Sequence, residues 1–122
     1  MIMDHKLKLM VVDDSPLFRT WLIHSLSADD RFQVVGYAVN ALDAQEKIPL
    51  LQPDMLTLDI EMPGMSGIDF LKQLLPVHPI PVILVSSLNL RVFDALEAGA
   101  VDFVRKPDEA NGLSKEIFLS TL

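Results

Sequence analysis

Residues 7–16 read Leu-Lys-Leu-Met-Val-Val-Asp-Asp-Ser-Pro, so a mostly apolar run ends in two acids that are followed by serine and proline. A short apolar run of this kind predicts a strand over Leu7–Val12. Ser15 before Pro16 is the usual N-cap and first-turn pair of a helix. The stretch therefore predicts a strand that passes into a helix through an acidic loop.

Apolar runs of the same kind recur along the chain. They are Phe32–Ala38, Met55–Ile60, Pro81–Val85 and Ala100–Val104. The runs are continuous rather than alternating, which is typical of parallel strands buried on both faces, and the intervals between them are long enough for helical crossovers. The pattern predicts one domain over residues 1–122, with a doubly wound α/β fold of the (βα)5 type and a parallel five-stranded sheet in the order 2-1-3-4-5.

Helix signals lie between these runs. A second helix is expected over Ala41–Leu51, with Pro49 near its end, where it should terminate or kink the helix. Ser66 and Asp69 resemble a capping box that begins a third helix. We expect a fourth helix over Leu90–Glu97, with Gly99 as its C-cap, and an amphipathic last helix that presents Leu113, Ile117 and Phe118.

Composition limits the possible functions. The chain has 122 residues and no cysteine, which excludes a disulfide framework and thiol chemistry. Its net charge of −7 disfavours direct binding to nucleic acid or to an anionic membrane. No apolar run approaches the ~20 residues of a membrane-spanning helix, and Met1–Lys8 lacks the apolar core of a secretory signal. We therefore expect a cytoplasmic protein whose function lies in a site.

Polar or charged residues follow four of the five predicted strands. They are Asp13 and Asp14 after the first, Asp59 at the third, Ser86 and Ser87 after the fourth, and Lys106 shortly after the fifth. In a doubly wound sheet, ligands bind beyond the carboxyl ends of the strands. We therefore expect three carboxylates and one cation to converge at this edge.

Such a cluster needs a compensating charge, because two unit charges ~4 Å apart repel by about 4 kcal/mol at an effective dielectric constant of ~20. A small site with only oxygen ligands favours a hard divalent cation, and Mg²⁺ accepts one or two carboxylates plus a phosphate oxygen. With Mg²⁺ and Lys106 opposed to it, a phosphoryl group could be transferred to one carboxylate. The sequence predicts an aspartate nucleophile in a Mg²⁺ site.

Each of these features alone has an ordinary structural explanation. An Asp-Asp pair after a strand is usually a turn or a cap, Lys106 with Pro107 is typical of a solvated loop, and Ser86 and Ser87 are typical caps of a following helix. Their joint occurrence at four strand ends favours a functional pocket. The three histidines have no metal-ligand spacing and are expected to be surface or packing residues.

At these residues the chain resembles a response-regulator receiver domain of flavodoxin-like fold, over nearly all its length from Leu7 to the last predicted helix. The matching segments are Val-Val-Asp-Asp-Ser at 11–15, Leu-Asp-Ile-Glu-Met-Pro-Gly-Met-Ser-Gly at 58–67, Ser86, and Phe-Val-Arg-Lys-Pro at 103–107. The resemblance implies a phosphoacceptor signalling domain of a two-component system, with Mg²⁺ as cofactor and a histidine kinase as phosphodonor.

The resemblance also implies roles for individual residues. Asp59 accepts the phosphoryl group from the phosphohistidine of the kinase. The implied Mg²⁺ ligands are Asp14, Asp59, Asp13 through water and the backbone carbonyl of Glu61; Lys106 and Ser86 bind the phosphoryl oxygens, and Phe103 is the switch aromatic. Because the chain has just left a strand, we expect the Glu61 side chain to lean over the mouth of the pocket.

Within the family, residues 57–63, 85–88 and 99–107 look most like the regulatory domain of the chemotaxis protein-glutamate methylesterase. This implies a methylesterase output domain that the chain lacks, so we expect no enzymatic activity beyond the chain's own phosphorylation and dephosphorylation. The alternatives are a stand-alone receiver or phosphorelay protein that acts by protein binding, and a phosphatase of the haloacid dehalogenase type. The phosphatase needs a second aspartate where Glu61 stands.

Overall fold

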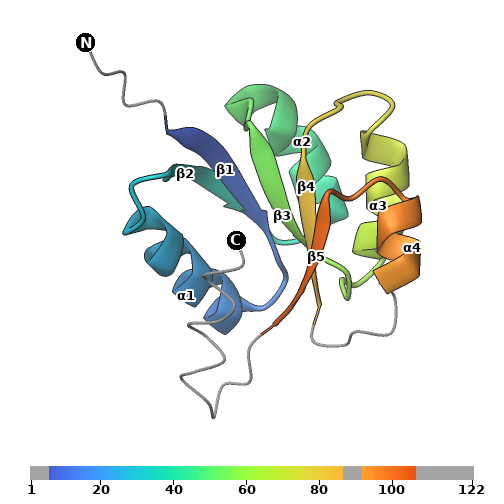
Figure 1. Ribbon diagram of the computed structural model, residues 1–122, viewed down its shortest axis with the longest axis horizontal. Coiled ribbons are helices and arrows are strands. Elements are labelled where there is room, and N and C mark those ends of the chain that lie inside the picture. Colours follow the sequence, from blue (N-terminus) through green and yellow to red (C-terminus); the bar gives the residue numbers. More distant parts are fainter. Residues whose placement is uncertain (1–5, 87–91, 107–122) are drawn as a thin grey trace.

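A computed structural model of the protein describes residues 6–86 and 92–106, with the side chains of Val92, Phe93, Ala95 and Phe103 excepted. Strands and helices alternate along this part of the chain (Figure 1). They are β1 (Leu7–Val12), α1 (Pro16–Ser27), β2 (Phe32–Ala38), α2 (Ala41–Leu51), β3 (Met55–Asp59), α3 (Gly67–Leu74), β4 (Val82–Ser86), α4 (Val92–Glu97) and β5 (Asp102–Arg105). The predicted last helix lies outside the described residues.

The five strands form one parallel sheet in the order β2-β1-β3-β4-β5, which confirms the predicted fold and topology. The register matters for function. Val12 of β1 pairs with Leu58 of β3, and Asp59 pairs with Val85 of β4. The next residues of β1 and β4 therefore emerge beside Asp59, at the carboxyl edge of the sheet.

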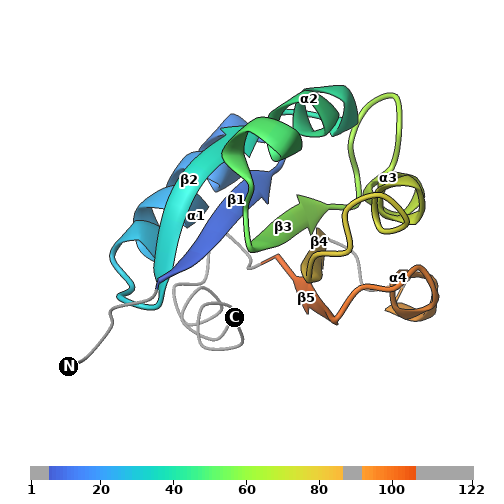
Figure 2. The same cartoon turned by 90° about the horizontal axis from the view of Figure 1, so that it is seen from above.

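Two apolar clusters pack on the two faces of the sheet. One joins α2 and α3 to alternate strand residues such as Met10, Leu58 and Leu84. The other joins Leu22 and Leu26 of α1 to the strand residues whose side chains point to the opposite face of the sheet, such as Val11 and Val85. Figure 2 shows α2, α3 and α4 grouped along one side of the sheet. Because both faces of β1, β3 and β4 are covered, these strands meet solvent mainly at their ends, where a site can form. Within the described residues, no helix is long and apolar enough to cross a membrane.

The caps explain where the helices begin. The Ser15 hydroxyl accepts from the Phe18 backbone N–H at 3.4 Å, and the Ser66 hydroxyl accepts from the Asp69 N–H at 3.2 Å, as predicted. Pro49 does not end α2, which continues to Leu51, because a proline removes only one intrahelical donor so close to the helix end.

Four predictions about the strands are corrected. β3 ends at Asp59 rather than at Ile60. β2 lies at an edge of the sheet with Gln33 and Tyr37 exposed, so it is not buried on both faces. β4 begins at Val82 and reaches Ser86, one residue later at each end than predicted. β5 ends at Arg105 rather than Val104 and begins at Asp102 rather than Ala100, because Gly99 has a positive φ of 102° and the chain is still turning there.

Candidate functional site

Asp13 is held firmly at the end of β1. Its backbone N–H donates to the Ala38 carbonyl at 3.0 Å, which extends the pairing with β2 by one residue. The Ser15 backbone N–H donates to Asp13 Oδ1 at 2.8 Å, and Arg19 Nη1 donates to the Asp13 carbonyl at 2.9 Å. Asp13 is only 2% exposed, so its carboxylate is fixed in a buried position.

Asp59 is the last residue of β3, the central strand, and is also 2% exposed. The chain after it turns back sharply, because the Gly67 backbone N–H donates to the Ile60 carbonyl at 2.9 Å. A Cβ at Gly67 would collide with the Asp59 carbonyl oxygen, so only glycine allows this close approach. The return of the loop fixes the backbone of Asp59 at the edge of the sheet.

Lys106 supplies the cation that the sequence predicted. Its Nζ lies 3.0 Å from Asp13 Oδ2 and 3.4 Å from Asp59 Oδ1, and 4.6 Å from the centre of the Phe18 ring. The Lys106 backbone N–H donates to the Ser86 carbonyl at 2.6 Å, which ties it to the end of β4. Asp13, Asp14, Asp59 and Lys106 are hereafter called the acidic pocket.

The carboxyl groups of the acidic pocket are poorly neutralised. Burial, and after it the charge of Asp13, raises the pKa of Asp59 to about 8 against the lowering effect of Lys106. Burial also raises the pKa of Asp13, against the lowering effects of the Ser15 backbone N–H and Lys106. One ammonium group shared between two buried carboxylates is therefore too little positive charge for this pocket.

The geometry fits a hard divalent cation. Asp13, Asp14 and Asp59 each offer a carboxylate oxygen, and these atoms all lie within 4.8 Å of one another. Both side-chain oxygens of Asp59 are buried and accept no hydrogen bond from the described residues. Asp14 is exposed, which leaves an approach from solvent. Oxygen ligands, excess negative charge and unsatisfied acceptors together suit a cation such as Mg²⁺.

Ser86 is at the predicted edge, but its hydroxyl has a partner that the sequence did not predict. The hydroxyl donates to Oε1 and Oε2 of Glu61, each at 2.6 Å. Glu61 was expected to lean over the pocket mouth, and its carboxylate reaches the end of β4. The Phe18 ring below Lys106 was also missed, since an aromatic residue on a helix is usually assigned to the core. The predicted Ser87 and the Phe103 side chain lie outside the described part of the chain.

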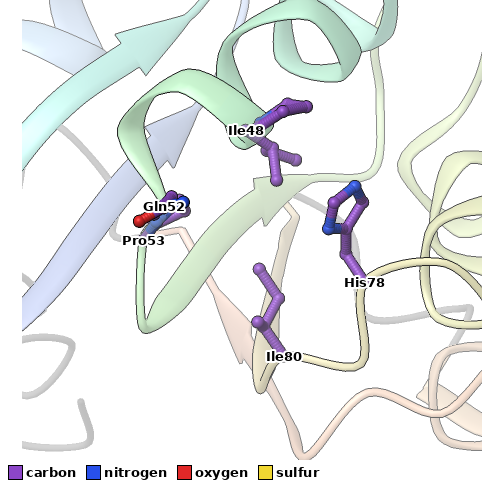
Figure 3. Close-up of a pocket in the computed structure, with 6 residues that line it drawn as sticks. Ile48, Gln52, Pro53, His78 and Ile80 are labelled. Carbon is purple, nitrogen blue, oxygen red and sulfur yellow. The ribbon is translucent and has the colours of Figure 1, made fainter.

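Two hollows lie away from the acidic pocket, one near the amino-terminal ends of β3 and β4 and the other between α2 and α3. One, of about 330 Å³, is lined by Ile48, Pro49, Gln52, Pro53, His78 and Ile80, where the end of α2 faces the segment before β4 (Figure 3). A second, of about 240 Å³, shares Ile48, Pro49 and His78. His78 is the only titratable residue in either lining, so these hollows offer no cluster of reactive groups. The chemistry lies at the acidic edge.

Comparisons with known proteins identify the family of the chain. A family profile described as "Response regulator receiver domain" matches residues 9–118. A protein-glutamate methylesterase/protein-glutamine glutaminase from Syntrophomonas wolfei is 48% identical over 96% of this chain and 34% of its own length. The chain thus spans about a third of the length of this curated relative.

Solved structures give the same result. The response regulator domain of CheB from Thermotoga maritima superposes with a TM-score of 0.85 at 37% identity, covering 96% of this chain and 91% of that one. A CheX–CheY–BeF3–Mg²⁺ complex from Borrelia burgdorferi has a TM-score of 0.74 at 26% identity, covering 95% of this chain and 90% of that one. The resemblance drawn from the sequence motifs is confirmed.

Proposed function

Because the chain belongs to the family of response regulator receiver domains, we propose that Asp59 accepts a phosphoryl group from the phosphohistidine of a histidine kinase and thereby transmits a two-component signal. One observation carries this proposal above the others. Asp59 is buried on the central strand, its oxygens accept no hydrogen bond from the described residues, and Lys106 lies 3.4 Å away. It is a confined nucleophile facing a cation.

In the proposed reaction, a carboxylate oxygen of Asp59 attacks the phosphorus of the phosphohistidine. A P–O bond forms, the P–N bond breaks, and the histidine nitrogen leaves with the electron pair. Lys106 holds the carboxylate and neutralises charge on a phosphoryl oxygen, while the Ser86 hydroxyl donates to a second one. Both groups reach the site from neighbouring strand ends, so the transferred group is oriented by rigid elements.

Mg²⁺ is the cofactor that this proposal requires, and when bound it supplies positive charge to the carboxylates and the phosphoryl oxygens. The proposed ligands are Asp14, Asp59, the backbone carbonyl of Glu61, and Asp13 through water. The 4.8 Å cluster of carboxylate oxygens supports this assignment. So does the related complex from Borrelia burgdorferi, which is named for its BeF3 and Mg²⁺.

The output is proposed to be a chemotaxis methylesterase domain on a longer parent protein, because the curated relative is about three times as long as the stretch matched here. Phosphorylation adds about −1.5 to −2 charge, which would draw Ser86 inward and give the Phe103 ring room to rotate. The surface of α4 and β5 would then change. Chemical-shift changes on adding BeF3⁻ should reach α4, and changes confined to the acidic pocket would contradict this switch.

Phosphorylation itself is tested with a small phosphodonor and Mg²⁺. Acetyl phosphate should add one phosphoryl group to the chain, as measured by intact mass, and Asp59→Asn should abolish the addition. Asp29→Asn serves as the matched control, because Asp29 lies on the surface turn between α1 and β2, and it should be labelled as fully as the parent. Undiminished labelling of the Asp59→Asn variant would refute the assignment of the nucleophile.

A further inference from the structure

The Ser86 hydroxyl is engaged by a carboxylate in the structure. It donates to both oxygens of Glu61 at 2.6 Å, a distance typical of a hydrogen bond to a charged acceptor. Ser86 is 2% exposed, so the hydroxyl faces the interior of the site rather than bulk water. Glu61 is exposed and follows Asp59 by two residues. The contact therefore joins the carboxyl ends of β3 and β4 across the place where a phosphoryl group would lie.

The same hydroxyl is required by the proposed phosphorylation. A serine hydroxyl carries a single proton, so it cannot donate fully to Glu61 and to a phosphoryl oxygen at once. The two acceptors are also both anions, and they repel one another when they approach the same donor. Glu61 and the phosphoryl group are consequently mutually exclusive partners of Ser86.

We propose that Glu61 is a built-in competitor of the phosphoryl group: its carboxylate holds the Ser86 hydroxyl in the resting pocket and must release it as Asp59 becomes phosphorylated. This inference rests on the proposed function of Asp59 and concerns the regulation of the same site. Glu61 acts through Ser86 and is a positioning residue. By stabilising the unphosphorylated arrangement, it lowers both the rate of phosphorylation and the affinity for phosphoryl mimics.

The length of the Glu61 side chain suits this role. From the position two residues after Asp59, a glutamate reaches the end of the neighbouring strand. A shorter or neutral residue at this position would leave the Ser86 hydroxyl to the incoming group. Replacing Glu61 by a neutral residue changes the net charge of the chain from −7 to −6, so the overall repulsion of an anionic donor falls only slightly.

The first test compares Glu61→Ala with the parent, using acetyl phosphate and saturating Mg²⁺. Loss of one charge-assisted hydrogen bond to the resting hydroxyl should raise the phosphorylation rate by about three- to tenfold. The apparent affinity for BeF3⁻ should rise by a similar factor. Glu46→Ala removes the same charge from an exposed position on α2 and should leave both quantities within about twofold of the parent.

The decisive test repeats the substitution without the hydroxyl. In a Ser86→Ala background, Glu61→Ala should change the phosphorylation rate and the BeF3⁻ affinity by less than about twofold, because the competitor acts only through Ser86. Equal gains in both backgrounds would overturn the proposal, since the effect would then be general repulsion of the donor. Absence of any gain in the parent background would overturn it as well. Thermal melts of all variants should be measured to check that each is folded.

These outcomes are distinguishable from failure of the proposed function. If the parent chain is not phosphorylated on Asp59, the receiver function itself is wrong for this chain. If the parent is labelled on Asp59 and the Glu61→Ala variant is labelled no faster, only the competitor role is wrong. BeF3⁻ binding provides an equilibrium measurement that does not depend on turnover of the donor.

Discussion

Asp29 and Asp59 both lie beside a cation, one on the exposed turn between α1 and β2 and the other in the acidic pocket. Arg31 Nη2 approaches Asp29 Oδ2 at 2.7 Å, and the Arg31 backbone N–H also donates to Asp29 at 2.9 Å. These hydrogen bonds, the side-chain ones first, lower the pKa of Asp29 to about 2. The Asp29 carboxylate therefore has its hydrogen-bond partners, and solvent screens its interaction with Arg31.

Asp59 has the opposite balance. Its cation, Lys106, is 3.4 Å away and is shared with Asp13. Burial, followed by the repulsion from Asp13, raises the pKa of Asp59 to about 8. The contrast shows that proximity to a cation does not by itself determine the state of a carboxyl group. Burial and the number of competing carboxylates decide it, and in the acidic pocket they favour neutralisation of Asp59 by a proton or by a further cation.

The largest expected effect tests this contrast through folding stability without Mg²⁺. A raised pKa in the folded state means that Asp59 stabilises the fold most below about pH 4, and that this contribution is lost as pH rises toward 8. Asp59→Asn should remove the loss and raise the free energy of unfolding by about 2–3 kcal/mol at pH 8. Urea unfolding in EDTA at several pH values measures the difference.

Asp29→Asn is the control for that experiment and has the opposite sign. Because its pKa is lowered to about 2, Asp29 contributes stability above about pH 4 and loses it as pH falls toward 2. Its substitution should leave the slope between pH 4 and 8 unchanged. If Asp59→Asn kept the slope of the parent, the acidic pocket would not be under the electrostatic stress that its geometry indicates.

The next effect concerns cation affinity. Asp14→Ala removes the exposed carboxylate of the cluster and should weaken Mg²⁺ binding by at least about tenfold. Trp21 fluorescence offers a signal, because the Trp21 and Phe18 ring centres are 5.6 Å apart and Lys106 Nζ lies over the Phe18 ring. A shift of Lys106 on Mg²⁺ binding should therefore change Trp21 fluorescence. Unchanged Mg²⁺ affinity and an unchanged phosphorylation rate in Asp14→Ala would refute the pocket.

Proton release provides a smaller but direct measure of the same stress. At pH 7 and without a metal, Asp59 with a pKa of about 8 is mostly protonated, and a carboxyl group must ionise to bind Mg²⁺. Binding should therefore release close to one proton at pH 7 and almost none at pH 9. Calorimetry in buffers of different ionisation enthalpy measures this number. Release that persists in Asp59→Asn would assign the proton to another group.

Much of this fold could be predicted from the sequence, because the apolar runs are strong signals and the strand ends carry the polar residues. The limits of β1 and β2 were predicted to the residue. The start of β5 depended on the turn at Gly99. The limits of β4 depended on its pairing with neighbouring strands, which no local sequence pattern encodes. The exposure of β2 follows from its edge position, which local burial patterns did not indicate.

The acidic pocket was also predicted in part from the sequence. Asp13, Asp14, Asp59 and Lys106 were predicted to converge, because parallel strands deliver their carboxyl ends to one edge, and the structure brings them together. The contact of Glu61 with Ser86 was not predicted, because it depends on the path of the loop after β3 and joins residues 25 apart. Sequence spacing places backbones reliably, whereas long side chains in loops are placed by their partners.

Glu61 combines features of the two regions and provides the smallest expected effect. Like Asp29 it lies outside the core, yet like Asp59 it contacts a buried group. Once the phosphoryl group has taken the Ser86 hydroxyl, the Glu61 carboxylate is displaced to the rim, where hydrolytic water must approach. A carboxylate there repels an incoming nucleophile and obstructs its path. The opposite role, a base that orients the water, is less favourable beside a pocket that already holds three acids.

Glu61→Ala or Glu61→Asn should therefore speed loss of the phosphoryl group by a few-fold, equivalent to about 1 kcal/mol of activation free energy. The measurement follows the intact mass of labelled protein after the donor is removed, with Glu46→Ala as the charge-matched control. Together with the expected faster phosphorylation, the variant should gain and lose phosphate more quickly than the parent. Longer retention of the phosphoryl group in Glu61→Ala would contradict this prediction. It would show that the Glu61 carboxylate assists hydrolysis by orienting the attacking water instead of repelling it.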